Sequence, residues 1–324
     1  MLALLAALLI GAPAADAGSP AGPAKLAIAQ GSVEGPAMPL KVGDDVEAGA
    51  PIKTAAGVRA TFDFPDGSEL RVNENTELSI DGPRKVTLKQ GHVFAKIGKG
   101  AGVFEVATPQ MKALSNQGLL DVEFIPRVPN GAPAQTFFRV LDGTAKCSGP
   151  KFTANVFPGF YATGIGSQLN TPDPLGNGSL TTAWMHPLLV ERGRIDEETG
   201  NRAMELVQIL GREAANDPGE AALRTLGDLA TAELVRMVSK SAGPAQAARR
   251  NTAVKIVAET GTLKSAAGLV SLLQHSEPEV RVVAARGLAR IAGKDLGFDD
   301  AFWKGEALEK GQKAWDDWVK QNAK

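Results

Sequence analysis

The sequence predicts an all-β domain followed by an α-helical domain. Between residues 25 and 164, apolar residues alternate with polar ones in short segments separated by turn sequences. From residue 183 onward the apolar period changes to 3.6 residues, the period of a helix with one buried face. The segment between them is rich in Gly, Pro, Asn, Ser and Thr and has neither period. We therefore expect a linker or a long surface connection at 165–183.

The β prediction depends on alternation and on turn chemistry. Phe62 and Phe64 are separated by one polar residue and precede Pro65-Asp66-Gly67, a tight-turn sequence. Further turns are expected at Gln90-Gly91 and Asp142-Gly143. Because short strands recur with no helical run between them, we expect an all-β sandwich or roll over 18–164, in which each strand buries one face.

The helical prediction depends on periodicity and on internal similarity. Helices are expected at 199–214, 218–239, 244–259, 262–274, 277–292 and 300–322. The segment 234–238 (LVRMV) recurs as 269–273 (LVSLL), a spacing of 35 residues. An internal period of this length with two helices per unit is typical of an α-solenoid, which we expect within 184–324.

The N-terminus has the layout of a secretory signal peptide. Residues 2–10 are almost purely Leu and Ala, and Ala15-Asp16-Ala17 precedes Gly18. We expect cleavage between Ala17 and Gly18, removal of residues 1–17, and export to the periplasm, the cell envelope or the exterior of a bacterium. The alternative is an uncleaved membrane anchor, although the apolar stretch is shorter than the ~20 residues that span a bilayer as a helix.

Composition excludes several classes of function. A net charge of −1 argues against a nucleic-acid-binding protein, which normally carries a basic excess. A single cysteine excludes a disulfide framework and a Cys-ligated zinc site. Cys147 lies in an expected strand, so we interpret it as a small buried residue and not as a reactive thiol.

Motifs for catalysis are not found. His92, His186 and His275 are scattered along the chain, and neither HExxH nor GxSxG occurs. We expect no enzymatic activity, no catalytic residue, no metal and no cofactor. A hydrolase on the β scaffold is the third-ranked hypothesis, since Asp63 and Asp66 are paired carboxylates, but the turn already explains Asp66.

Several stretches of the β half resemble a known family. They are Val42-Gly43-Asp44-Asp45-Val46, Asp66-Gly67-Ser68, Gln90-Gly91, 104–109 (FEVATP), 138–143 (FRVLDG) and Pro158-Gly159. Together they cover about residues 30–164, which resemble the FecR-type domain of bacterial envelope proteins. The resemblance implies a β fold without catalytic chemistry. Some members of the family signal to a sigma factor, and the alternative function given below depends on those members.

The helical half is similar to HEAT repeats over about residues 196–295. The best match is 275–293, which includes Glu279-Val280-Arg281. The resemblance implies a protein-binding array in which Arg281 braces neighbouring repeats. The tryptophans near the end resemble a terminal cap, which a repeat array needs for solubility: Trp303, Trp315 and Trp318.

The candidate partner-binding residues are basic. Arg249, Arg250, Arg286 and Arg290 lie on the expected second helices of the repeats. If those helices line one face, the arginines would bind an anionic protein or peptide. The alternative is a solvated face whose arginines pair with acids on neighbouring turns.

The sequence therefore favours an exported, non-enzymatic envelope protein that acts as an interaction scaffold or a sensing module with an unidentified protein partner. The alternative is a membrane-anchored FecR-type regulator of transmembrane signalling to a sigma factor. The membrane is involved only if the N-terminal segment stays uncleaved.

Overall fold

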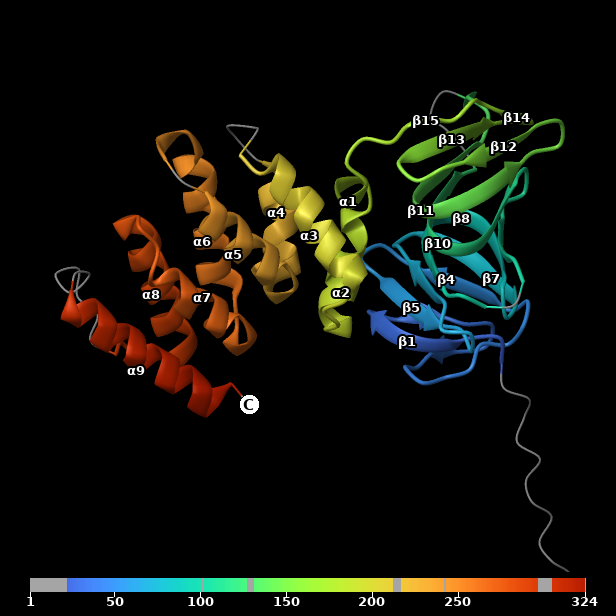
Figure 1. The fold of residues 1–324 in the computed structure, drawn as a ribbon. Helices are drawn as coiled ribbons and strands as arrows, with labels where there is room; N and C mark the ends of the chain where they lie inside the picture. Colours follow the sequence, from blue (N-terminus) through green and yellow to red (C-terminus); the bar gives the residue numbers. More distant parts are fainter. Residues whose placement is uncertain are drawn as a thin grey trace, which may run out of the picture.

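A computed structural model describes residues 22–100, 102–126, 131–211, 217–241, 243–296 and 305–323. The expected signal peptide with Ala17 and Gly18, and also Trp303, lie outside the described residues. A mostly β region precedes a helical region, as the sequence predicts (Figure 1). Within the described ranges, none of the helices has both the length and the apolar character needed to cross a bilayer.

The strands of the β region pair into one continuous sheet, antiparallel except between β8 and β9. They are β1 (Lys25–Gln30), β2 (Val33–Glu34), β3 (Pro39–Leu40), β4 (Pro51–Thr54), β5 (Arg59–Asp63), β6 (Glu69–Val72), β7 (Thr76–Gly82), β8 (Lys85–Ile97), β9 (Phe104–Ala107), β10 (Lys112–Ile125), β11 (Gln135–Ser148), β12 (Thr153–Val156), β13 (Phe160–Ile165), β14 (Gln168–Leu169) and β15 (Asp173–Pro174).

Three long strands divide this sheet into two halves. The first part of β8 pairs with β7 and β9, whereas its second part pairs with β6 and β10. Strand β10 passes in the same way from β9 to β8, and β11 passes from β13 to β12. The sheet therefore folds over as a roll, and its inner side chains form one apolar core that includes Phe62, Leu88, Phe104 and Phe138. Cys147 is buried in this core, which confirms its interpretation as a buried residue.

Glycines allow the long strands to bend. Gly91 in β8 and Gly118 in β10 have φ of 96° and 116°, values that side chains with a Cβ rarely adopt. A Cβ at Gly91 would lie 2.6 Å from the Cα of Thr76, and one at Gly118 would lie 2.7 Å from the carbonyl carbon of Asp142. The expectation that Gln90-Gly91 and Asp142-Gly143 end strands was wrong, since both pairs lie inside strands, where the glycine turns the chain without ending it.

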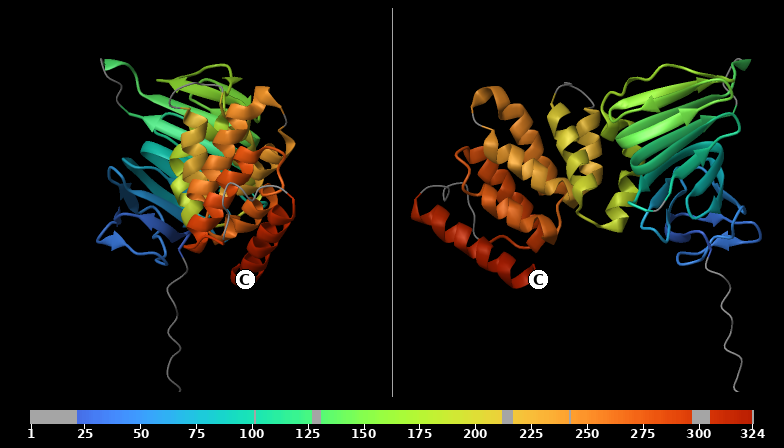
Figure 2. Two further views of the ribbon diagram at one scale, coloured as in Figure 1. Left: turned by 90° about the vertical axis from the view of Figure 1, so that its left-hand side faces the viewer. Right: turned by 45° about the vertical axis from the view of Figure 1, so that its right-hand side comes forward.

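The helices follow the β region in sequence order, as the right-hand view of Figure 2 shows. They are α1 (Gly178–Thr181), α2 (His186–Arg192), α3 (Glu197–Ile209), α4 (Pro218–Leu226), α5 (Thr231–Lys240), α6 (Ala247–Thr260), α7 (Ala266–Leu272), α8 (Pro278–Ala292) and α9 (Glu306–Asn322). Contacts between alternate helices form two rows, α3–α5–α7–α9 and α4–α6–α8, and the rows pack on each other through pairs such as α5 with α6. Whether these rows form a HEAT-like solenoid remains a prediction.

Two segments differ from the expected pattern. The single helix expected at 218–239 is wrong: Gly227 (φ 52°) ends α4, and a 3₁₀ turn at Gly227–Ala230 leads into α5. The segment 165–183, expected as a linker or surface connection, carries β14 and β15 on β13 and then α1, which the side chain of Asn177 caps by accepting from the Leu180 N–H at 2.9 Å. The boundaries between domains remain a prediction.

Candidate functional site: a charged sheet face under the helices

One face of the β region is charged and lies against the helices. Alternate residues of a strand point to opposite faces, so Leu70 and Val72 of β6 enter the core while Glu69 and Arg71 point outward. The outward residues of β8 are His92, Phe94 and Lys96 by the same alternation. Phe94 is fully buried within the apolar cluster of the helical region. This outward surface, formed by β5, β6 and the second parts of β8 and β10, is called the charged face below.

Arg71 and Glu198 form the central contact between the charged face and the helices. The guanidinium group of Arg71 donates to both carboxylate oxygens of Glu198, one of them at 2.9 Å, and also donates to Glu69 at 3.0 Å. The side chains of Arg71 and Glu198 are 3% and 4% exposed. Lys96 and Arg202 lie 3.2 and 3.4 Å from the same carboxylate. Glu198 therefore interacts with three cations, one of them from its own helix.

The charges around Glu198 determine whether its carboxyl group is ionised. Burial alone would raise the pKa of this carboxyl group, because it disfavours the charged form. Arg71, Arg202 and Lys96 outweigh burial and lower the pKa of Glu198 to about 2. The carboxylate is therefore ionised at any pH at which the protein is expected to work.

The ends of two helices add further ion pairs to the same face. Arg192, in the last turn of α2, donates to Asp63 at 2.8 Å and to Glu69 at 3.1 Å. Asp196, which caps the N-terminus of α3, accepts from Lys96 at 2.7 Å. A cation near a helix C-terminus and an anion at a helix N-terminus both complement the helix dipole. Each helix is thus fixed to the sheet at the end where its dipole favours the contact.

The buried charges specify how the two regions fit together. Removing a charge from water costs several kcal/mol, so a buried ion pair stabilises a fold little compared with an apolar pair of the same shape. A single charge left without its partner is strongly unfavourable, however. Both Arg71 and Arg202 also lie over the ring of Phe94, 5.4 and 5.1 Å from its centroid. Any shift of the helices along the sheet would separate these groups.

A second polar chain crosses the same surface from β8 to β11. His92 Nε2 lies 2.6 Å from the carboxylate of Asp121, which is fully buried and accepts from Arg139 at 2.7 Å. Arg139 also donates to Glu123 at 2.7 Å. Burial would raise the pKa of Asp121, but His92 and Arg139 lower it. Trp184, just before α2, packs on the His92 ring with centroids 5.0 Å apart.

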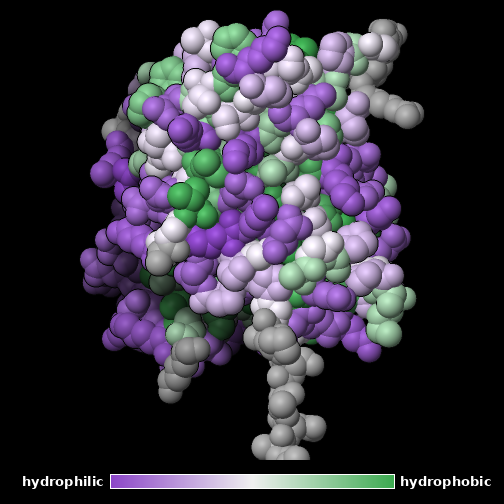
Figure 3. Space-filling model, turned by 90° about the vertical axis from the view of Figure 1, so that its right-hand side faces the viewer, coloured by the Kyte–Doolittle hydropathy of each residue, from purple (hydrophilic) through white to green (hydrophobic). Residues whose placement is uncertain are grey.

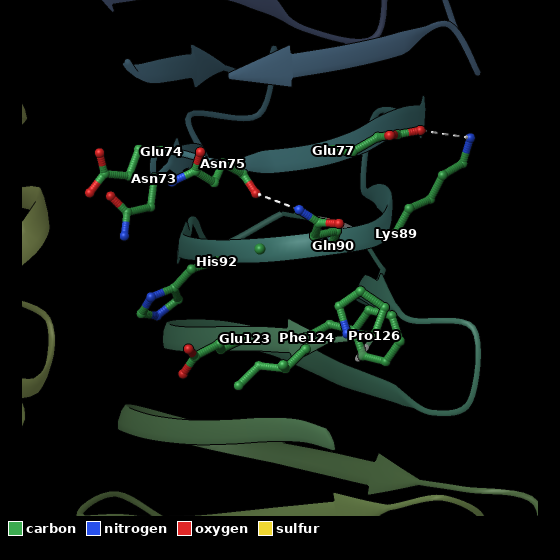
Figure 4. Close-up of a pocket in the computed structure, with 12 residues that line it drawn as sticks. Asn73, Glu74, Asn75, Glu77, Lys89, Gln90, His92, Glu123, Phe124 and Pro126 are labelled. Atoms are coloured by element: carbon green, nitrogen blue, oxygen red, sulfur yellow. Dashed lines mark hydrogen bonds and ion pairs between the residues drawn. The ribbon is translucent and has the colours of Figure 1, made fainter. Parts of the chain in front are cut away.

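A polar cavity of about 760 Å³ opens beside His92 (Figure 4). Its carboxylates already have cationic partners: Glu77 lies 3.1 Å from Lys53, and Glu123 pairs with Arg139. The residues that line it include no Ser, Thr or Cys that His92 could activate as a nucleophile. In the described part of the chain, no group of three or more His, Cys, Asp or Glu side chains could hold a metal ion.

The face of the β region that lies away from the helices is mainly hydrophilic, with small separate hydrophobic patches (Figure 3). Scattered apolar residues of this kind are normal on a soluble surface.

The structure does not gather the four predicted partner-binding arginines into one site. Arg249 donates to the carbonyl of Val207 in α3. Arg250 is buried and donates to the carbonyl of Gly243 at 3.2 Å, and Arg290 donates to the carbonyl of Ala258 at 2.8 Å. Three of the four guanidinium groups thus bind backbone carbonyls of helix ends and loops. Their role in partner binding remains a prediction.

Arg286 differs from those three arginines, whereas Arg281 resembles them. Arg286 is exposed on α8, and it makes no hydrogen bond or ion pair within the described ranges. Arg281 donates to the carbonyls of His275 and Ser276 at 2.7 and 3.0 Å, which places it as a brace of the loop before α8.

The charged face was not predicted from the sequence. A charged residue at an outward strand position or on a helix is usually solvated. The sequence pattern therefore gives no reason to expect a site at Arg71, Lys96, Glu198 and Arg202. The only available signal was that Arg71 stands alone between two apolar residues of a strand.

Comparison with known proteins supports the family assignment for part of the chain. Residues 50–146 match the family model described as FecR protein. Two crystal structures of a candidate anti-sigma factor from Parabacteroides distasonis ATCC 8503 are similar at 16% and 17% sequence identity, each with a TM-score of 0.36. Each similarity covers 42% of this chain and 64% of the other chain, so the chain spans less than two thirds of those proteins. No curated protein matches the chain.

Proposed function

We propose that this protein is a regulatory protein of the FecR type, which acts by binding a partner protein and not by catalysis. The observation that carries the proposal is the match of residues 50–146 to the FecR family model. Strands β5, β6, β8 and β10, which carry the charged face, all lie within these residues. In some FecR-type proteins this domain takes part in signalling to a sigma factor, and this is the role we propose here.

The contact between the charged face and the helices supports a regulatory role. Arg71 and Lys96 belong to the part that matches the FecR model, whereas Glu198 belongs to the helical region. Because Arg71 and Glu198 are buried together and Lys96 is half-buried beside them, a partner that reorients the helices must disturb the ion pairs on the sheet. We propose that binding at the helical region is transmitted to the FecR-type domain through this contact.

We further propose that residues 196–295 are a HEAT-like solenoid that holds the partner. The segment 234–238 lies in the middle of α5, and the similar segment 269–273 covers the last part of α7 and the residue that follows it. Helices α5 and α7 are neighbours in the same row, as successive repeats would be.

We also propose export to the bacterial envelope, with residues 1–17 as a signal peptide. Mass spectrometry of the protein purified from its host tests this. A mature chain that begins at Gly18 supports a cleaved signal peptide, whereas a mass that includes residue 1 supports the anchored form.

The regulatory role is tested by deleting the gene in the host and comparing transcripts. We expect a small set of transcripts under one sigma factor to change and to return to normal when the wild-type protein is supplied. Supplying Glu198→Gln should not restore them, since it breaks the central contact. The matched variant Glu233→Gln should restore them, because the ion pair that Glu233 forms within the described ranges is with Arg236, on the partly exposed side of α5. Identical transcripts with and without the gene would contradict the proposal.

The second candidate is an envelope scaffold without a transcriptional role. An exposed groove between α6 and α8, described below, favours this candidate because it offers a binding surface on the helices alone. Cross-linking that recovers an envelope protein, together with unchanged transcripts in the deletion strain, would favour the scaffold over the regulator.

A further inference from the structure

A groove of about 350 Å³ lies between α6 and α8, which belong to the row α4–α6–α8. Helix α3, whose N-terminal end contacts the charged face, belongs to the other row. Half-buried Val282 and Val283 lie along it, and Pro278 lies at the end where α8 begins. Val282 and Val283 pack with their inner sides against the apolar cluster of the helical region. The groove therefore has a rigid apolar floor that belongs to the folded core.

The rim of the groove is basic. Lys255 of α6 and Arg286 of α8 are exposed, and neither forms a hydrogen bond or an ion pair with any residue in the described part of the chain. Among the described residues that line the groove, Glu279 supplies the one carboxylate, which accepts from the amide of Asn251 at 2.9 Å, so Lys255 and Arg286 leave the lining with a net positive charge. The groove thus offers two unused positive charges beside apolar surface.

These two cations differ from other basic residues of the row α4–α6–α8. Arg250 and Arg290 have acceptors within the fold, as described above, and their guanidinium groups are occupied. Arg224 of α4 pairs with both Glu220 and Glu259. An unpaired cation on a helix surface remains available for a ligand, whereas these paired residues are not available.

We propose that this groove binds an acidic segment of a partner protein. One branched apolar side chain of the segment packs on Val282 and Val283, and carboxylates on either side of it pair with Lys255 and Arg286. Complementary charge sets the orientation and the association rate, and the apolar contact adds affinity. The proposal rests on the proposed function, since it names the kind of partner that the helical region holds.

The test uses the purified protein and a fluorescein-labelled peptide, Glu-Asp-Leu-Asp-Glu, followed by fluorescence anisotropy. Two further peptides accompany it, Glu-Asp-Ser-Asp-Glu and Lys-Lys-Leu-Lys-Lys. The small groove predicts a Kd of roughly 0.1 mM for the leucine peptide. The affinity should fall several-fold when salt is raised from about 0.05 to 0.5 M, because the exposed charges become screened.

The variant Lys255→Glu/Arg286→Glu should weaken binding at least tenfold. Its matched control is Lys310→Glu/Lys313→Glu, which makes the same change in net charge at exposed positions of α9. The control should bind within about twofold of the wild type. Both variants should unfold at the wild-type temperature, since none of the four side chains has a partner among the described residues.

Equal binding of the leucine peptide by the wild type and by Lys255→Glu/Arg286→Glu would overturn the proposal. Equal binding of the serine and leucine peptides would overturn it too, because the apolar floor would then contribute nothing. Binding of the lysine peptide in preference to the acidic ones would also contradict it. None of these results would bear on the transcript comparison, so the regulatory proposal stands or fails separately.

Discussion

Arg71 of β6 and Glu198 of α3 are 127 residues apart in the sequence, yet each has the other as its main ionic partner. Both side chains are almost completely buried. The pair therefore joins the sheet to the helices at one defined position, with Phe94 beneath it.

The first prediction concerns this pair. Among the described residues, replacing Glu198 with Gln leaves Arg71 with Glu69 as its remaining carboxylate partner and leaves Arg202 with no carboxylate in contact. We expect the free energy of unfolding in urea to fall by about 3 kcal/mol. The control Glu233→Gln removes an exposed pair on α5 and should cost less than about 0.5 kcal/mol. Similar losses for the two variants would show that the buried pair has no special role.

The second prediction concerns pH. Burial, together with the nearby Arg202, lowers the pKa of His186 to about 3. Below about pH 6.5 the unfolded chain binds a proton at His186, whereas the folded chain does not. The contribution of His186 to the free energy of unfolding is therefore present above about pH 6.5 and is lost as the pH falls toward 3. The loss is at most about 1.4 kcal/mol per pH unit.

Urea unfolding at several pH values between about 6.5 and 5 tests the role of His186. The variant His186→Gln should show a flatter dependence than the wild type in that window. The variant Glu198→Gln should instead flatten the profile below about pH 4.5, since the Glu198 carboxylate stabilises the fold above that pH and loses its effect as the pH falls toward 2. An unchanged slope in His186→Gln would contradict the burial of a neutral histidine.

The third prediction concerns the bend in β8. Alanine at position 91 would have both an unfavourable φ and a Cβ in contact with the backbone of Thr76. Gly67 also has a positive φ, but a Cβ there would have no atom within 4 Å. We expect Gly91→Ala to lose at least ~1 kcal/mol more stability than Gly67→Ala, as thermal or urea unfolding would measure. Equal losses would mean that the strand relaxes around the new methyl group.

The fourth prediction concerns the thiol. Burial raises the pKa of Cys147 to about 12, so the native protein at pH 8 contains the neutral, inaccessible form. A thiol-reactive chromogenic disulfide should not react with the native protein but should titrate one thiol after unfolding in urea. The variant Cys147→Ser gives the background. Rapid reaction of the native protein would show that the strand opens around this residue.

The sequence predicts which side chains of a strand enter the core, but it does not predict which elements pack on the outer face of the sheet. The alternation around Phe62 and Leu70 correctly places their side chains in the core. The same alternation directs Arg71 away from the core but gives no information about the helix that lies on it. The ion pair depends on how a segment 127 residues later folds back, and a local pattern does not contain that information.

The candidate arginines illustrate a similar limit. Helical spacing correctly placed Arg250 and Arg290 on helices, which are α6 and α8. Helical spacing does not reveal that the carbonyls of Gly243 and Ala258 accept from these two arginines. Every residue has a backbone carbonyl, and only the fold determines which carbonyls are left to accept from a side chain. The single helix expected at 218–239 failed for a related reason, because one glycine, Gly227, takes a positive φ that the apolar period does not reveal.

The ion pairs across the charged face also limit which domains can be exchanged between this protein and others. A FecR-type domain brought in from another protein would place a different set of charges opposite Glu198 and Arg202, and an uncompensated charge would then be buried. Acceptable exchanges must therefore carry the strands β5, β6 and β8 together with helices α2 and α3. We expect related chains to inherit these elements as one block, even where their remaining helices differ in number.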